Sequence, residues 1–164
     1  MIVNGRTLLD AAPINNMARD KHRLYGVSYG MSEAGYDIRV KQDIVFKKGL
    51  FRRTVSVGAQ KPVKGNFTLA STIEHFEMPN NLVGIVHDKS THIRKGLIVG
   101  NTVIEPGWSG YLTLELFYHG NEDLIIKAGS GIAQVIFHTV INPVNYIGKY
   151  QNQPDKPVEA IYEK

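Results

Sequence analysis

The stretch between Asp88 and Glu115 concentrates side chains that could bind phosphate and transfer a proton. It contains the cluster Lys89-Ser90-Thr91-His92-Ile93-Arg94 and reaches a glutamate, Glu115, in a following apolar run. Hydroxyls and backbone N–H groups beside fixed cations bind phosphate oxygens or orient a water molecule. A carboxylate can accept and return a proton. The stretch therefore predicts a site that hydrolyses a nucleotide.

The same residues have plain structural readings. The cluster could be a turn that only caps a strand end, and Glu115 could be an exposed strand residue. In a strand over 111–118, alternate residues share a face, so the leucines 112, 114 and 116 would meet the core and Glu115 would point the other way, among aromatic side chains. Partly apolar surroundings would raise the pKa of Glu115 and suit it to acid–base work near neutral pH.

The elements that must position these residues are mostly strands. Alternating apolar residues and short runs broken by Gly, Pro and Asn predict an all-β sandwich or barrel. We expect strands over 36–40, 54–57, 82–86, 111–118, 124–126 and 132–137. A short helix is expected after Asn4, over 6–12, because Pro13 would end it. The length predicts one domain over 1–164, with 142–164 as a polar strap or flap.

The composition excludes several kinds of chemistry. The chain has no cysteine, so disulfide scaffolds, thiolate–zinc sites and cysteine nucleophiles are excluded. The absence of cysteine also fits a reducing compartment. No run has the apolar length of a signal peptide or a membrane span. We therefore expect a soluble cytoplasmic protein with no membrane partner.

Charge is distributed unevenly along the chain. Residues 1–64 hold 12 Lys or Arg against 5 Asp or Glu, whereas residues 65–164 hold 7 against 10. The densest basic run comprises Lys47, Lys48, Arg52, Arg53, Lys61 and Lys64. A nucleic-acid groove is one interpretation, but no recognition helix or stacking motif accompanies the run. We favour a solvated hairpin face, with no nucleic-acid partner, and a small polyanionic ligand elsewhere.

Four sequence blocks resemble the dCTP deaminases, the deaminating branch of the dUTPase-like superfamily. In chain order they read GIVHDKSTHIRKGLIV, VIEPGWSGYLTLEL, GIAQVIF and KYQNQ. The family writes the first two roughly as G-R-S-S-x-x-R-x-G and I-D-P-G-W-x-G-x-x-x-L-E. Upstream, the stretch 35–40 is similar to the superfamily's early Asp-[Leu/Val/Ile]-Arg strand. The resemblance covers about residues 32–40 and 82–153.

The resemblance implies a distorted antiparallel β-barrel of the dUTPase-like (β-clip) type. It further implies a homotrimer with active sites at subunit interfaces, and hydrolysis of dCTP to dUTP and ammonia. Mg²⁺ would bridge the triphosphate, and no metal would hold the attacking water. This agrees with the residues. His75-Phe76-Glu77 spells the H-x-E of zinc deaminases, but their P-C-x-x-C partner cannot exist here, so we expect no zinc.

The resemblance also implies residue roles. Glu115 would take a proton from the water that attacks C4 and return it to the pyrimidine as ammonia leaves. Ser90 would position that water, and Arg94 would hold Ser90 and Glu115 in place. The implied nucleotide-binding residues are Lys89, Thr91, Asn101, Glu105, Thr113, Leu114, Gln134, Tyr146, Lys149 and Gln153.

Some departures from the family pattern leave alternatives open. Between Arg94 and Ile104 the family carries a couple more residues, including a Thr-Ala pair in the base pocket, so the identity of the base is open. A dUTPase, or a bifunctional enzyme that also releases pyrophosphate, is the runner-up, supported by Gln134 and Asn101. A non-enzymatic nucleotide-sensing or protein-binding barrel would be expected to have lost Ser90, Arg94 or Glu115, and all three are present.

Overall fold

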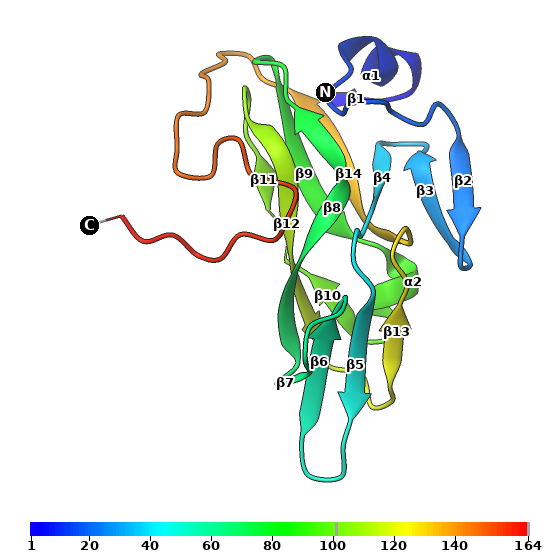
Figure 1. The fold of residues 1–164 in the computed structure, drawn as a ribbon. Helices are drawn as coiled ribbons and strands as arrows, with labels where there is room; N and C mark the ends of the chain where they lie inside the picture. The colour runs from blue at the N-terminus through cyan, green and yellow to red at the C-terminus, as the bar shows by residue number, and fades with distance from the viewer. Residues whose placement is uncertain (101, 164) are drawn as a thin grey trace.

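Three antiparallel β-sheets form the framework of the computed structural model, which describes residues 1–100 and 102–163 (Figure 1). The largest sheet has the order β11(Val103–Ile104), β9(Leu82–Asp88), β14(Gly131–Thr139), β4(Tyr36–Arg39), β3(Val27–Met31) and β2(Lys21–Leu24), with β1(Ile2–Val3) paired to β14. A second sheet contains β10(Leu97–Val99), β12(Ser109–Tyr118) and β8(Phe67–Glu77). The third contains β13(Leu124–Ile126), β5(Ile44–Lys48), β6(Arg53–Val57) and β7(Val63–Lys64).

The mostly-β fold predicted from the sequence is confirmed. Each of the six expected strands exists, as β4, β6, β9, β12, β13 and β14, within a few residues of its predicted bounds. The longest strand, β8, was not among them. It pairs with β12 over almost its whole length, in a register that shifts at one bulge between Tyr111 and Thr113.

The two helices of the described part are both short. The first, α1(Gly5–Ala11), is the predicted one, and it ends where Ala12 turns into the left-handed region at φ 46° immediately before Pro13. The second, α2(Ser90–Ile93), is a single helical turn where we expected only a loop or turn. It closes because the N–H groups of His92 and Ile93 both donate to the carbonyl oxygen of Lys89.

Strand β12 has the two faces that its alternation predicts. Leu112, Leu114 and Leu116 are 7%, 1% and 0% exposed and belong to the core. Glu115 lies on the opposite face and is half-buried. The β-period thus fixes which side of the sheet carries the carboxylate.

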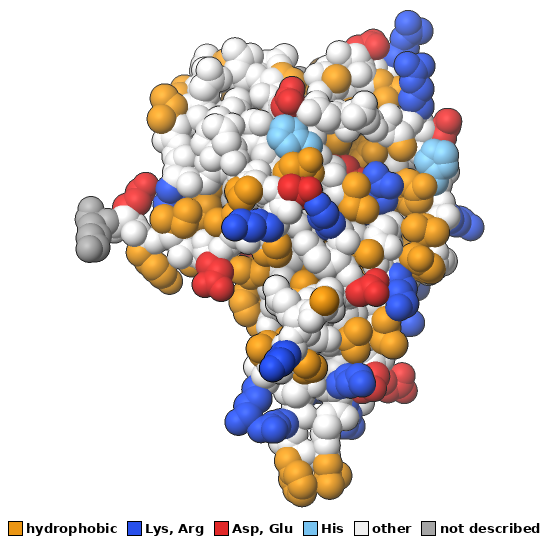
Figure 2. Space-filling view, in the orientation of Figure 1, with side chains coloured by type: hydrophobic (Ala, Val, Ile, Leu, Met, Phe, Trp, Pro, Cys, Tyr) orange, Lys and Arg blue, Asp and Glu red, His pale blue; other side chains and the backbone are white. Residues whose placement is uncertain are grey.

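The basic run lies on the β5–β6 hairpin and the adjacent β7. This hairpin extends away from the rest of the molecule (Figure 1), and the space-filling view shows its cations around an apolar tip (Figure 2). Lys47, Lys48 and Arg52 are exposed, as expected for a solvated hairpin face. Leu50 and Phe51 at the tip are 91% and 94% exposed.

Neither helix of the described residues has the length and apolar character needed to cross a membrane.

Candidate active site

A cavity of about 920 Å³ lies between the outer face of β8 and β12 and the C-terminal tail. Its walls come from segments far apart in the sequence. They include Phe67, Thr68 and Leu69 of β8, Thr113 and Glu115 of β12, the stretch 102–105, and Tyr146, Tyr150, Gln153 and residues 156–160 of the tail. The carboxylate of Glu115 therefore faces a concave site that could enclose a small ligand.

Glu115 is held in an unusual electrostatic environment. Its Oε2 atom is buried and has no hydrogen-bond partner. Burial raises the pKa of the Glu115 carboxyl above its ordinary value, because removal from water disfavours the charged form. Burying a hydrogen-bond acceptor without a partner costs free energy. A bound hydrogen-bond donor, or a proton on the carboxylate itself, would remove that cost.

Gly100 keeps the space beside this carboxylate open. Its N–H donates to the carbonyl oxygen of Glu115 at 2.7 Å. A Cβ atom at Gly100 would lie 3.0 Å from the Cβ of Glu115 and 3.2 Å from its Oε2. A side chain at this position would crowd the unpartnered oxygen, and the Glu115 side chain would have to shift by a few tenths of an ångström.

The C-terminal tail is bonded along β12 rather than extending freely. The hydroxyl of Thr113 donates to Oε1 of Gln153 at 2.9 Å and accepts from the N–H of Val158 at 3.0 Å. The backbone N–H of Tyr111 donates to the carbonyl oxygen of Gln153, and the indole of Trp108 donates to that of Tyr150 at 2.7 Å. The segment expected as a strap thus forms one wall of the cavity.

The cluster before and within α2 lies elsewhere. Ser90, Thr91 and Arg94 are exposed, and none of them lines the cavity. In the described part of the chain no ion pair joins Arg94 to Glu115. The turn is anchored by His92, which is 6% exposed and whose Nε2 lies 2.8 Å from the carbonyl oxygen of Gly131.

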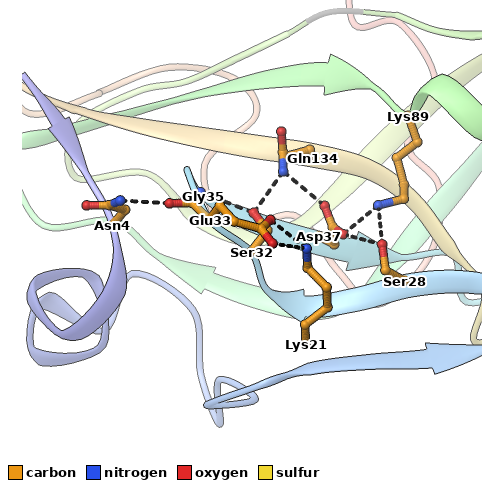
Figure 3. A network of polar contacts seen from close by, with 9 residues as sticks. All are labelled: Asn4, Lys21, Ser28, Ser32, Glu33, Gly35, Asp37, Lys89 and Gln134. Carbon is orange, nitrogen blue, oxygen red and sulfur yellow. Dashed lines mark hydrogen bonds and ion pairs between the residues drawn. The ribbon is translucent and has the colours of Figure 1, made fainter.

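Lys89 and Gln134 belong to a polar network that joins α2 to the large sheet (Figure 3). Nζ of Lys89 lies 2.5 Å from Oδ2 of Asp37 and 3.0 Å from Oγ of Ser28. The hydroxyl of Ser28 donates to the same Oδ2 atom at 2.7 Å. Nε2 of Gln134 donates to Oγ of Ser32 at 2.8 Å and to Oδ1 of Asp37 at 3.3 Å.

The expected site residues therefore fall into separate groups. Those that line the cavity are Glu105, Thr113, Glu115, Tyr146 and Gln153. Leu114 has its side chain in the core behind the cavity wall. Lys149 is exposed beside the cavity, with Nζ 5.4 Å from the centre of the Tyr150 ring. Asn101 lies outside the described residues.

Several residues that shape the site were not predicted from the sequence. Asp37 was noted only as part of a strand motif, and the contribution of Tyr150 and Val158 to the cavity wall was not foreseen. No local pattern marks a contact between residues 52 positions apart, such as Asp37 and Lys89. The only sequence signal was a carboxylate inside the predicted strand 36–40, because a charge that becomes buried in a sheet is usually paired.

Solved structures of known proteins identify the fold. The dUTPase of EIAV superposes with a TM-score of 0.51 and 20% sequence identity, covering 73% of this chain and 88% of that one. The 2'-deoxycytidine 5'-triphosphate deaminase of Agrobacterium tumefaciens superposes with a TM-score of 0.56 and 14% identity, covering 85% of this chain and 48% of that one. The protein thus has the dUTPase-like fold.

Sequence relatives narrow the class further. The family model described as dCTP deaminase-like matches residues 59–140. The dCTP deaminase of Roseiflexus castenholzii is 37% identical over 145 residues, which cover 77% of this chain and 79% of the relative. That of Campylobacter lari is 40% identical over 145 residues, covering 77% and 78%. The chain belongs to the dCTP deaminase family.

Proposed function

We propose that the protein hydrolyses dCTP to dUTP and ammonia. The observation that carries this proposal is the carboxylate of Glu115, which is buried at one oxygen without a partner and faces a ligand-sized cavity. In a chain of the dCTP deaminase family, such a group has the position and the raised pKa of a general acid–base residue.

The reaction needs both protons of the attacking water to be moved. Glu115 accepts one proton from water as the oxygen forms a bond to C4 of cytosine, and passes it to N3 of the ring. It then takes the proton of the new C4 hydroxyl and gives it to the amino group, so that the C4–N bond breaks, ammonia departs and the C4 carbonyl of dUTP forms. Because its pKa is raised, the Glu115 carboxyl holds that proton more readily near neutral pH than an exposed glutamate would.

The remaining catalytic groups come, in this proposal, from a neighbouring copy of the chain. Ser90 and Arg94 are exposed and do not line the cavity of their own chain. An arginine and a hydroxyl from a neighbour would supply the donor that Oε2 of Glu115 lacks. We therefore propose a homotrimer whose active sites are shared between chains, consistent with closed symmetric assembly.

The phosphates would be held by residues at the mouth of the cavity. Lys149 and Gln153 of the tail offer a cation and an amide, and Thr91 and the α2 turn of a neighbour offer a hydroxyl and backbone N–H groups. The set suits a triphosphate that arrives with Mg²⁺, which would neutralise part of the phosphate charge. We place this activity in the cytoplasm, that of the host if the gene is viral.

A product assay tests this proposal. Purified protein is incubated with each deoxynucleoside triphosphate and Mg²⁺, and the products are separated. Ammonia and dUTP from dCTP support the proposal. Pyrophosphate and dUMP from dUTP alone would replace it with a dUTPase, and no product from any nucleotide would favour a binding module.

A bifunctional enzyme is the second candidate. Glu105 lines the same cavity as Glu115, so a second carboxylate is available to activate a water molecule that attacks the phosphate chain. In that case dCTP would yield ammonia, pyrophosphate and dUMP in the same assay, whereas a Glu105 variant would yield ammonia and dUTP.

A further inference from the structure

The ion pair between Asp37 and Lys89 is buried and closely bonded. The two side chains are 3% and 10% exposed, and Ser28 bonds to both of them. Asp37 lies on β4, in the middle of the large sheet, and its second carboxylate oxygen accepts from Gln134 of β14. Hydrogen bonds from Ser28 of β3 and Gln134 of β14 therefore hold the Asp37 carboxylate in place, in addition to its ion pair with Lys89 (Figure 3).

The lysine sits at the start of the α2 turn. The carbonyl oxygen of Lys89 accepts the N–H groups of His92 and Ile93, and the turn residues 90–94 follow directly. Holding the Lys89 side chain against β4 therefore fixes the place from which the turn departs. The second anchor, between His92 and Gly131, fixes its far side.

We propose that Asp37 is a positioning residue for the deamination, acting through Lys89 to hold Ser90 and Arg94 where they complete the site of a neighbouring chain. The inference rests on the proposed function. It also gives Lys89 a different main role from that of a phosphate ligand, because its charge is already compensated by a buried carboxylate at 2.5 Å.

The two roles of Lys89 predict different kinetics. A phosphate ligand contributes to binding, so its loss would raise KM for dCTP, and removal of Asp37 would free the cation for phosphate. A positioning pair affects the geometry of the transition state, so loss of either partner would lower kcat with a smaller change in KM. Each single replacement leaves one buried charge without its partner, whereas replacing Asp37 and Lys89 together by uncharged residues leaves none.

A double-mutant cycle decides between them. We expect Asp37→Asn and Lys89→Met each to lower kcat by at least about 10-fold, and the double variant to recover several-fold of that loss, since residues in contact commonly show coupling of this size. If Lys89→Met instead raises KM with kcat unchanged, and Asp37→Asn retains normal kcat, the proposal is overturned.

The chain provides a matched control pair. Arg39 and Glu74 form another ion pair, in which the glutamate is buried and the arginine is partly exposed. Nε of Arg39 lies 2.8 Å from Oε1 of Glu74, and the pair joins β4 to β8. Glu74→Gln should lower thermal stability as Asp37→Asn does, yet leave kcat close to the wild-type value. An equal loss of kcat in both variants would mean that general destabilisation, and not the turn, is responsible.

Hydrogen exchange of the peptide spanning 89–96 gives a readout that does not depend on activity. It should exchange faster in Asp37→Asn than in wild type, and at the wild-type rate in Glu74→Gln. Unchanged exchange in Asp37→Asn would contradict the proposal even if the enzyme were inactive.

A wild-type protein that fails to deaminate dCTP would refute the proposed function alone. If Asp37→Asn does not fold, Ser28→Ala weakens the same contacts without unpairing a charge and should shift exchange in the same direction.

Discussion

At the scale of single residues, the strand period decides where Glu115, the proposed acid–base group, lies. Its neighbours on β12 are core leucines, so the strand cannot slip without exposing them. The carboxylate on the opposite face is thereby fixed beside Gly100, the residue that leaves Oε2 uncrowded. The leucine face thus fixes the position of the carboxylate, and burial of Glu115 raises its pKa.

Replacing Glu115 by Gln should abolish most deamination while leaving dCTP binding nearly intact. The amide keeps the shape but cannot accept the proton, and general acid–base catalysis contributes about 10²–10⁴-fold. Single-turnover kinetics and calorimetric titration with dCTP measure the two effects. Glu105→Gln, which changes another carboxylate of the same cavity, should lose far less. Near-normal turnover of Glu115→Gln would make this glutamate a mere strand residue.

The same residue should set the acidic limb of the pH profile. The base must be ionised to accept a proton, and the pKa of Glu115 lies above its ordinary value of 4.5 because of burial. Turnover should therefore fall, as pH is lowered, at a higher pH than for an exposed glutamate. The residual activity of Glu115→Gln should lack this limb.

At the scale of elements, α2 is a single turn whose position depends on tertiary contacts. A four-residue helix has almost no intrinsic stability, so its contacts at Lys89 and His92 decide where it lies. His92 is nearly excluded from water, and burial lowers the pKa of its imidazole, with the nearby charges of Lys89 and Lys95 acting in the same direction. The element that carries Ser90 and Arg94 is thus sensitive to protonation.

The stability that neutral His92 contributes should be lost as pH drops below about 6.5, the ordinary pKa of histidine. The folded chain keeps His92 neutral, whereas the unfolded chain binds a proton there, so the unfolded state gains protons and is favoured. Thermal unfolding between pH 7.5 and 5.5 measures the slope. His92→Gln should flatten it, because the amide can still donate to Gly131 but cannot be protonated. His119→Gln, at an exposed position, should leave the slope unchanged.

At the scale of the whole molecule, one chain holds only part of the proposed site. The outer face of the β8–β12–β10 sheet also carries a row of partly exposed apolar residues. The rings of Phe67 and Phe117 pack at a tilted angle with centroids 4.6 Å apart, and Ile98 is the strand partner of Phe117. A neighbouring chain placed here would cover this row and reach the cavity.

Light scattering at micromolar concentration should therefore show a trimer.

Mixing two inactive-site variants should show whether the active sites are shared between chains. Ser90→Ala and Glu115→Gln should each lose most activity alone, but unfolding the two variants together and refolding the mixture should restore part of it. With random assembly, about a quarter of the sites would combine an intact Glu115 with an intact Ser90 from the neighbour. A fully active monomer, or a mixture as inactive as its parts, would contradict the arrangement.

The sequence predicted the strands better than the contacts between them. Alternation and leucine spacing located β12 and its two faces because a half-buried strand imposes a period of two. Strand β8 carries polar and apolar residues of mixed size and was missed. The pairing of Asp37 with Lys89, and of Thr113 with Val158, depends on how distant segments fold together. Family resemblance supplied the candidate site residues, and the structure divides them between the cavity, the α2 turn and the polar network of Figure 3.

The indole of Trp108 lies where its fluorescence can report the position of the C-terminal tail. It is the chain's single tryptophan, it is 5% exposed at the cavity wall, and its N–H is bonded to the carbonyl oxygen of Tyr150 in the tail. Any withdrawal of the tail would break that bond and admit water to the ring. The intrinsic fluorescence of this protein is therefore a direct optical signal of whether the tail is seated, with no label attached.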